Sequence, residues 1–210
     1  MTAQAVFDAA FRRAEAGRPA TFTVSGGGGR MTFDPALWCR DDLPGDDALL
    51  APCAGPTLDV GCGPGRLSAA LARSGRPALG IDVSAAAVRL ARRRGATALL
   101  RDVFDPLPGT GRWRHLLLAD GNIGIGGDPV RLLRRCRDLL APGGQAHAEF
   151  APPGTASWSG TATAHRGPEV SALAWASVAF DDAGAVAAAA GMRVLDTRTE
   201  AGRWFATLTA

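Results

Sequence analysis

The chain has 210 residues, which suits a single domain and is enough to bury one substantial hydrophobic core. Hydrophobic residues make up 47% of it and the mean hydropathy is +0.05, values typical of a globular protein. The formal net charge of +3, from 23 basic and 20 acidic side chains, does not call for a polyanionic partner. We therefore expect no nucleic-acid partner. No apolar run approaches the length of a membrane-spanning helix, so we expect no membrane partner either.

Charged residues near the N-terminus and unpaired cysteines favour the cytoplasm. Asp8, Arg12 and Glu15 interrupt the N-terminal segment, whereas a secretory signal would keep its central part apolar. The four cysteines, at positions 39, 53, 62 and 136, form no C-x-x-C pair and lack metal-ligand spacing. We therefore expect reduced thiols, no bound metal and a cytoplasmic location.

Residues 1–53 combine helical and strand-like patterns. Apolar residues recur at helical spacing between residues 3 and 16, which predicts one amphipathic helix. Strand-forming residues stand on both sides of Gly26–Gly29, which predicts a hairpin with a flexible tip. Residues 35–53 are expected to form short helices that lead into the first core strand.

From residue 57 onward, short apolar segments alternate with amphipathic ones. The short segments predict strands, and the amphipathic ones predict helices because their apolar residues recur every three or four positions. Ser84 and Asp128 stand where helix N-caps are expected. The predicted strands are 57–61, 78–83, 97–101, 114–120 and 145–151, and the predicted helices are 66–74, 84–95 and 128–140. Strands that alternate with helices imply a parallel sheet with right-handed crossovers.

The C-terminal third departs from this alternation. Residues 152–179 are rich in Pro, Gly, Ser and Thr and show no helical period. We expect an insertion there, positioned near the carboxyl ends of the strands, where α/β folds bind ligands. An alanine-rich helix is expected at 181–190, followed by strands at 192–199 and 203–208.

The most informative segment is Leu58–Gly65, an apolar strand that runs into a turn with glycines at positions 61, 63 and 65. Glycine allows a sharp bend and lets a ligand approach the backbone without a Cβ in the way. The helix that follows presents unpaired N–H groups to an anionic ligand group. The pattern therefore predicts a nucleotide-type cofactor site. A dinucleotide fingerprint starting at Gly61 would need glycine at position 66, where this chain has Arg66.

Read from Asp59 as D-x-G-x-G-x-G, the loop closely resembles motif I of the class I S-adenosylmethionine (SAM)-dependent methyltransferases. Further segments resemble the same family in the same order, between about residues 57 and 150. They are Asp82 at the end of the second strand, Arg101–Phe104 after the third, Leu117–Asn122 at the end of the fourth and Leu139–Gly144 before the fifth.

The resemblance implies a Rossmann-like, doubly wound α/β fold. Its mostly parallel seven-stranded sheet would have the order 3-2-1-4-5-7-6, and the last pair of strands would include one antiparallel strand. Residues 1–53 would form an N-terminal helix and hairpin cap, and residues 54–210 a SAM-binding core that contains the insertion at 152–179. Together they would make one structural domain.

The resemblance also implies a role for each matching residue. The backbone of the glycine loop would line the methionine and ribose parts of SAM, and Asp59 and Asp120 would lie near its ammonium group. Asp82 would accept hydrogen bonds from the ribose hydroxyls and Asp102 from the adenine amino group, while the valine after each acid would lie beside the adenine. The implied cofactor-binding residues are Asp59, Gly61, Cys62, Gly63, Gly65, Asp82, Val83, Asp102, Val103 and Asp120. Each also has a structural reading, as a turn glycine, a helix-start acid or a solvated loop acid.

Methyl transfer from a sulfonium needs the acceptor held in line, and a general base helps only when the acceptor must lose a proton. The candidate catalytic residues are Asn122 after the fourth strand, Glu149 on the fifth strand and His165 in the insertion. Glu149 is the candidate nearer the carboxyl end of its strand. His165 lies in a polar segment and has solvation as its alternative.

We therefore predict a SAM-dependent methyltransferase that acts on a small molecule, as a monomer or homodimer. The glycine-rich segment Asp120–Asp128 replaces the Asn/Asp-Pro-Pro-aromatic motif of many amino-group and nucleic-acid methyltransferases. No separate domain for a macromolecular substrate is apparent. The alternatives are a non-catalytic protein that binds SAM or its product S-adenosylhomocysteine (SAH), an RNA methyltransferase and an NAD-dependent oxidoreductase.

Overall fold

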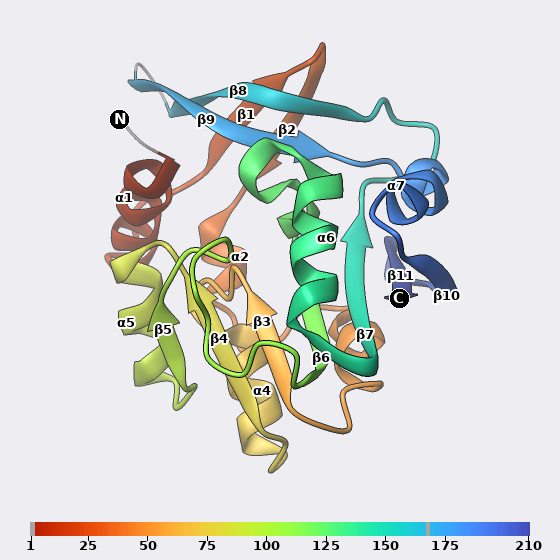
Figure 1. Cartoon of the computed structure of the whole chain (residues 1–210). Coiled ribbons are helices and arrows are strands. Elements are labelled where there is room, and N and C mark those ends of the chain that lie inside the picture. Colours follow the sequence, from red (N-terminus) through yellow and green to blue (C-terminus); the bar gives the residue numbers. More distant parts are fainter. Residues whose placement is uncertain (1–2, 167–168) are drawn as a thin grey trace.

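Seven strands of the described chain form one sheet, in the order β10-β11-β7-β6-β3-β4-β5 (Figure 1). A computed structural model describes residues 3–166 and 169–210. The strands of this sheet are β3 (Thr57–Val60), β4 (Ala78–Asp82), β5 (Ala98–Leu100), β6 (Trp113–Leu118), β7 (Leu140–Phe150), β10 (Arg193–Glu200) and β11 (Arg203–Thr209). β3 to β7 pair in parallel, whereas β11 runs antiparallel to β7 and β10. In chain order this is the predicted 3-2-1-4-5-7-6 arrangement, and the predicted fold class is confirmed.

Helices pack on both faces of this sheet because alternate residues of its strands point to opposite sides. Leu116 and Leu118 of β6 pack in one cluster with α6 and α7, whereas Leu117 packs in another with α3 and α4. Ser84 Oγ accepts a hydrogen bond from Ala87 N at the start of α5, and Asp128 Oδ1 accepts one from Arg131 N at the start of α6. Both predicted N-caps are therefore present. The helices are α3 (Asp46–Leu50), α4 (Arg66–Arg73), α5 (Ala85–Arg93), α6 (Pro129–Leu139) and α7 (Ala183–Ala189), with 3-10 turns η1 (Asn122–Gly127) and η2 (Phe180–Asp182).

A second, four-stranded sheet lies above the carboxyl ends of β3, β4 and β6, in the order β2-β1-β8-β9 (Figure 1). It combines the predicted hairpin, β1 (Phe22–Gly26) and β2 (Gly29–Phe33), with β8 (Trp158–Arg166) and β9 (Glu169–Ser177) from the predicted insertion. β1 pairs antiparallel with β8, so that Thr23 lies opposite His165. The N-terminal helix α1 (Ala3–Glu15) and the short α2 (Pro35–Trp38) pack beneath this sheet. We call α1, α2 and these four strands the cap.

The insertion thus has regular strands where the sequence showed only the absence of a helical period. Trp158, Ala162 and Ala164 are buried on one face of β8, and the residues between them are more exposed. This alternation has the strand period of two, but small residues carry most of it, so its hydrophobic contrast is weak.

The side chain of Trp158 packs closely against the glycine run Gly26–Gly29. A Cβ on Gly27 would lie 2.5 Å from the Trp158 Cβ, and one on Gly29 would lie 2.4 Å from its Nε1. The flexible tip expected from these glycines is therefore only the turn Gly27–Gly28, and its neighbours are needed for close packing. Within the described ranges, no helix combines the length and the apolar character required to cross a bilayer.

Candidate cofactor and acceptor site

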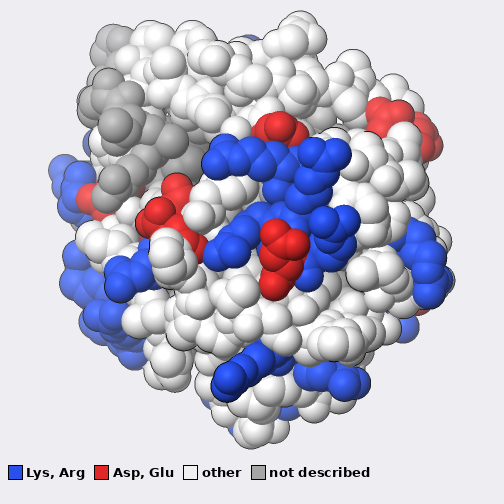
Figure 2. All heavy atoms as spheres, viewed as in Figure 1, with Lys and Arg blue, Asp and Glu red and all other residues white. Residues whose placement is uncertain are grey.

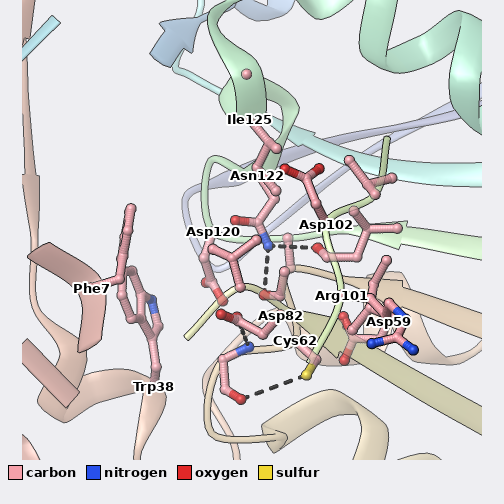
Figure 3. A pocket seen from close by; sticks show the side chains of 18 of the residues that line it. Phe7, Trp38, Asp59, Cys62, Asp82, Arg101, Asp102, Asp120, Asn122 and Ile125 are labelled. Carbon is pink, nitrogen blue, oxygen red and sulfur yellow. Dashed lines mark hydrogen bonds between the residues drawn. The ribbon is translucent and has the colours of Figure 1, made fainter. Parts of the chain in front are cut away.

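A cavity of about 420 Å³ lies between the carboxyl ends of the core strands and the cap. All the predicted cofactor-binding residues except Gly65 line it. Figure 3 shows Asp82, Asp120 and Asn122 on the core side, with Phe7 and Trp38 of the cap facing them. The sheet brings these groups together because the carboxyl ends of its parallel strands lie at the same edge.

The glycine loop has the backbone conformation that its residues suggest. Gly61 and Gly63 have φ values of +71° and +53°, in the left-handed region that glycine adopts without strain. A Cβ on Gly61 would lie 2.7 Å from Asn122 Nδ2. Cys62 is buried, and its side chain contributes to the packing between β4 and α5. The loop thus lines the cavity mainly with backbone.

Gly65 has a different role from its neighbours in the motif. It begins α4 with φ +83°, and a Cβ there would lie 2.7 Å from the Ala91 Cβ of α5. The close approach of α4 to α5 therefore requires glycine at this position. The structure places Gly65 behind the cavity, in helix packing.

Two carboxyl groups, that of the buried Asp59 and that of the half-buried Asp82, line the cavity at the ends of β3 and β4. Asp82 accepts hydrogen bonds from Gly63 N (2.9 Å) and Ser84 N (2.8 Å), and Asp59 accepts one from Ser68 Oγ (2.6 Å). Burial raises the pKa of each carboxyl to about 6, and these hydrogen bonds oppose that shift. Both groups are thus poised to gain hydrogen-bond donors or a cation from a ligand.

Asp102 and Val103 line the cavity beyond β5. Asp102 Oδ1 accepts a hydrogen bond from Phe104 N at 3.0 Å, which fixes the turn, and Val103 is 3% exposed. The guanidinium of Arg131 lies 3.9 Å from the centre of the Phe104 ring. Val83, Val103 and Phe104 all line the cavity with apolar side chains, and we call this lining, which adjoins the Asp102 carboxylate in sequence, the slot.

Asp120 stands at the centre of a buried network of charges. It follows β6 with φ +54°, a left-handed conformation that is uncommon outside glycine. Its carboxylate pairs with Arg66 and, at 3.2 Å, with Arg203, and both arginines also pair with Asp46. Burial and the nearby Glu149 raise the pKa of Asp120, while the two guanidinium groups oppose the shift. The network holds a strained acid at the edge of the cavity.

Comparison with known proteins identifies this part of the chain. Residues 57–144 match the family model described as a methyltransferase domain. They contain the glycine loop, Asp82, Asp102 and Asp120, which are the residues that carried the resemblance seen in the sequence. No curated protein matches the chain.

Solved methyltransferase structures share the fold. A SAM-dependent methyltransferase from Bacteroides fragilis, in complex with SAH, has a TM-score of 0.77 and 21% identity over 99% of this chain and 94% of that one. The 1,6-didemethyltoxoflavin-N1-methyltransferase of Burkholderia thailandensis has a TM-score of 0.57 and 18% identity over 79% and 76%. A sugar N-methyltransferase from Streptoalloteichus has a TM-score of 0.57 and 20% identity over 79% and 87%. At these identities the similarity concerns the fold.

The three predicted catalytic residues lie in different surroundings. Glu149 does not line the cavity. Arg203 donates two hydrogen bonds to its carboxylate, at 2.9 and 2.7 Å. Glu149 also accepts a hydrogen bond from Asp120 N at 2.7 Å. His165 is exposed on β8, away from the cavity lining. Asn122 lines the cavity, but its Nδ2 donates to Val60 O and Gly61 O, both at 2.9 Å.

The cap contributes lining residues that the sequence analysis did not single out. All of them are apolar, and most are aromatic. They are Phe7, Phe11, Phe33, Trp38, Ala174 and Trp175. The signal in the sequence was the helical spacing of Phe7 and Phe11, which ordinary core packing explains equally well.

Among the described residues, one cluster of potential metal ligands lies outside the lining of the cavity. Cys53, His115 and His147 are buried, and one potential ligand atom from each lies within 4.8 Å of the others. His115 Nδ1 and His147 Nε2 are 3.1 Å apart while the ring centres are 5.3 Å apart, so the two nitrogens face each other directly. The two nitrogens are within hydrogen-bond distance, and burial lowers the pKa of His147 to about 3.

Proposed function

We propose that the chain is a SAM-dependent methyltransferase that transfers a methyl group to a small-molecule acceptor. The observation that carries the proposal is the convergence of the glycine loop, Asp82 and Asp102 on one cavity, since all of these residues lie in the segment that matches the methyltransferase domain model. Several proteins of similar fold were crystallised with SAM or SAH, which supports the same cofactor here.

The residues of the cavity suit the parts of SAM. Asp82 would accept hydrogen bonds from the ribose hydroxyls, and Asp102 and the slot would hold the adenine. Asp59 and Asp120 would face the ammonium group, with Arg66 within reach of the carboxylate because it lines the same end. The bound cofactor would supply an activated methyl group. The protein would orient the acceptor and exclude water beneath the cap.

We do not propose Glu149 or His165 as a general base. Glu149 is held by Arg203 outside the cavity, and His165 is exposed on β8. Asn122 faces the cavity and would position the glycine loop, since its amide N–H groups are already committed to Val60 and Gly61. The site then suits an acceptor atom that needs little help with deprotonation.

We propose no nucleic-acid partner, although arginines gather on the face shown in Figure 2. Arg134 and Arg137 of α6 donate to the carbonyls of Ala189 and Ala190 at 2.9 Å, and Arg135 donates to Val103 O at 2.8 Å. These contacts fasten α6 to its neighbours. We further propose a cytoplasmic location, because the four cysteines carry free thiols, and a monomer or homodimer.

The proposal is tested by titrating the protein with SAM, SAH and NAD in a calorimeter, and then supplying methyl-labelled SAM with a cell extract. We expect binding of SAM and SAH, no binding of NAD, and label in the small-molecule fraction. Binding without transfer to any fraction would support the non-catalytic alternative. Label in RNA, or binding of NAD alone, would contradict the proposed function.

A further inference from the structure

The cap side of the cavity is a continuous aromatic surface. The ring centres of Trp38 and Phe33 are 5.7 Å apart, those of Phe33 and Trp175 are 5.6 Å apart, and those of Trp175 and Phe7 are 5.6 Å apart. Phe11 extends the row beside Trp38, at 5.9 Å. We call these five residues the aromatic wall. In Figure 3, Phe7 and Trp38 of this wall face the side of the cavity that carries Asp82 and Asp120.

Among the residues that the structure describes, the charged groups that line the cavity all come from the core. The cap residues that line it are the aromatic wall and Ala174, and none of these can take up a proton. Four acids lie opposite: Asp59 accepts from Ser68, Asp82 from two backbone N–H groups and Asp102 from Phe104 N, and Asp120 pairs with two arginines. The proposed function assigns all four to groups of SAM. An alcohol, which must lose its proton to react, would therefore find no free base beside it.

A neutral nitrogen avoids this requirement. Its lone pair forms a bond to the methyl carbon while the carbon–sulfur bond breaks and its electron pair passes to sulfur. The positive charge moves from the sulfonium to the nitrogen, and any hydrogen on that nitrogen leaves to water afterwards. Aromatic faces stabilise such a cation where water is excluded.

We propose that the acceptor is a neutral nitrogen base on a flat, apolar frame, and that the aromatic wall stabilises the methylated cation. This inference rests on the proposed function, since it names the substrate class of the same site. Of the wall residues, Trp38 is the most suitable for mutation because it is half-buried at the end of α2, whereas Trp175 is only 5% exposed.

The test compares two probes of similar shape, cationic N-methylquinolinium and neutral 1-methylnaphthalene, by calorimetry on the SAH-loaded protein. We expect the native chain to bind the cation more tightly. Trp38→Leu should weaken binding of N-methylquinolinium by about 2- to 30-fold, the range for one cation–π contact, and change binding of 1-methylnaphthalene much less. Trp38→Phe keeps an aromatic face, so it should weaken binding of N-methylquinolinium less than Trp38→Leu does. Trp113→Leu, which removes a tryptophan at the other end of the sheet, is the control and should bind both probes as the native chain does.

The outcomes separate the two proposals. If SAH binds but the native chain shows no preference for the cation, the acceptor class is wrong and the proposed cofactor remains. If SAH itself does not bind, the proposed function fails first. Transfer of label to alcohols but to no amine or ring nitrogen in a substrate panel would also overturn the acceptor class. The native chain's preference between the probes decides the matter even if Trp38→Leu does not fold.

Discussion

Asp82 is a half-buried acid that already accepts two backbone hydrogen bonds, yet desolvation raises its pKa to about 6. In the unliganded protein, this carboxyl therefore gains a proton when the pH falls only modestly below neutrality. Hydroxyl donors from a bound ribose would favour the ionised form and lower the pKa again. Binding and deprotonation of Asp82 are thus linked.

We predict that SAH affinity falls as the pH decreases through 6. At pH 5 the affinity should be about tenfold weaker than at pH 7, one pH unit below the pKa of the free protein. Asp82→Asn should weaken binding at pH 7 by about 1.5–3 kcal/mol, or 10- to 150-fold, and flatten the pH dependence to what Asp59 contributes. Calorimetry at several pH values measures both effects.

The exposed Asp105, which lies beside the site but outside its lining, provides the control. Asp105→Asn should reproduce the native pH profile. A native profile that is flat between pH 5 and 7 would refute the link. Stability of the unliganded protein should change with the opposite sign: a folded-state pKa above the unfolded value makes the free energy of unfolding decrease as the pH rises from about 4 to 6.

Residues of the cofactor loop were predictable because their signal is local. Glycines at alternate positions after a strand, followed by Asp82 at the end of the next strand, predicted a shared cleft, and the structure has these residues, except Gly65, in the lining of one cavity. The environment of Glu149 was not predictable. Its partner Arg203 lies 54 positions away on another strand, and only the sheet brings the two together. From the sequence alone, a carboxylate near the end of a strand that acts as a general base cannot be distinguished from one that forms an ion pair.

At the scale of elements, Glu149 connects β7 to β11 and to the turn after β6. We predict that Glu149→Gln lowers the free energy of unfolding by about 1–3 kcal/mol. This is less than the full cost of breaking a buried pair, because Arg203 keeps Asp46 and Asp120 and both side chains of the pair are 15% exposed. SAH affinity should also fall, since Glu149 fixes the backbone of Asp120. Urea denaturation and calorimetry measure the two effects.

Arg198 offers a matched control, because its pair with Asp196 is half-exposed on β10. Arg198→Gln should change the free energy of unfolding by less than about 1 kcal/mol. If Glu149→Gln kept full stability and full SAH affinity but lost the transfer rate, Glu149 would be a catalytic base after all.

The contact between α4 and α5 gives a second prediction at this scale. Gly65→Ala should destabilise the fold by about 2–4 kcal/mol, the sum of a left-handed conformation and overpacking against Ala91. Gly75 has a similar φ of +73° with open space around its Cβ position, so Gly75→Ala should cost only the conformational part, about 1–2 kcal/mol. Thermal or urea unfolding compares them. Equal losses would show that helix packing does not require glycine at position 65.

Across the whole molecule, the core sheet followed from the sequence but the cap sheet did not. The alternation of strands and helices and the resemblance to a known family predicted the order of the seven strands. β8 has no comparable signal, because its buried face carries small residues such as Ala162 and Ala164. Its pairing with β1 joins segments far apart in the chain, and no local pattern encodes that contact.

We predict that the cap can unfold separately from the core, and that Trp158 stabilises the cap by holding β8 to Gly26, Gly27 and Gly29 of the β1–β2 hairpin. Trp158→Ala should lower the opening free energy of β1, β2 and β8 by about 3 kcal/mol and leave α6 unaffected. Amide hydrogen exchange would measure this as faster exchange confined to the cap. Val170→Ala, at a 58% exposed position of β9, is the control, and its amide hydrogens should exchange at the native rates. Equal acceleration in α6 would show that cap and core unfold together.

The pairing of β1 with β8 also has a consequence for the newborn polypeptide. The β1–β2 hairpin leaves the ribosome more than a hundred residues before β8, the strand that pairs with β1. During that interval the edge of β1 has no partner strand. The half of the fold that we expect to hold the methyl donor can assemble during that interval. The cap sheet can be completed only once translation has passed Ser177, the end of β9, and β10 and β11 of the core sheet follow later still.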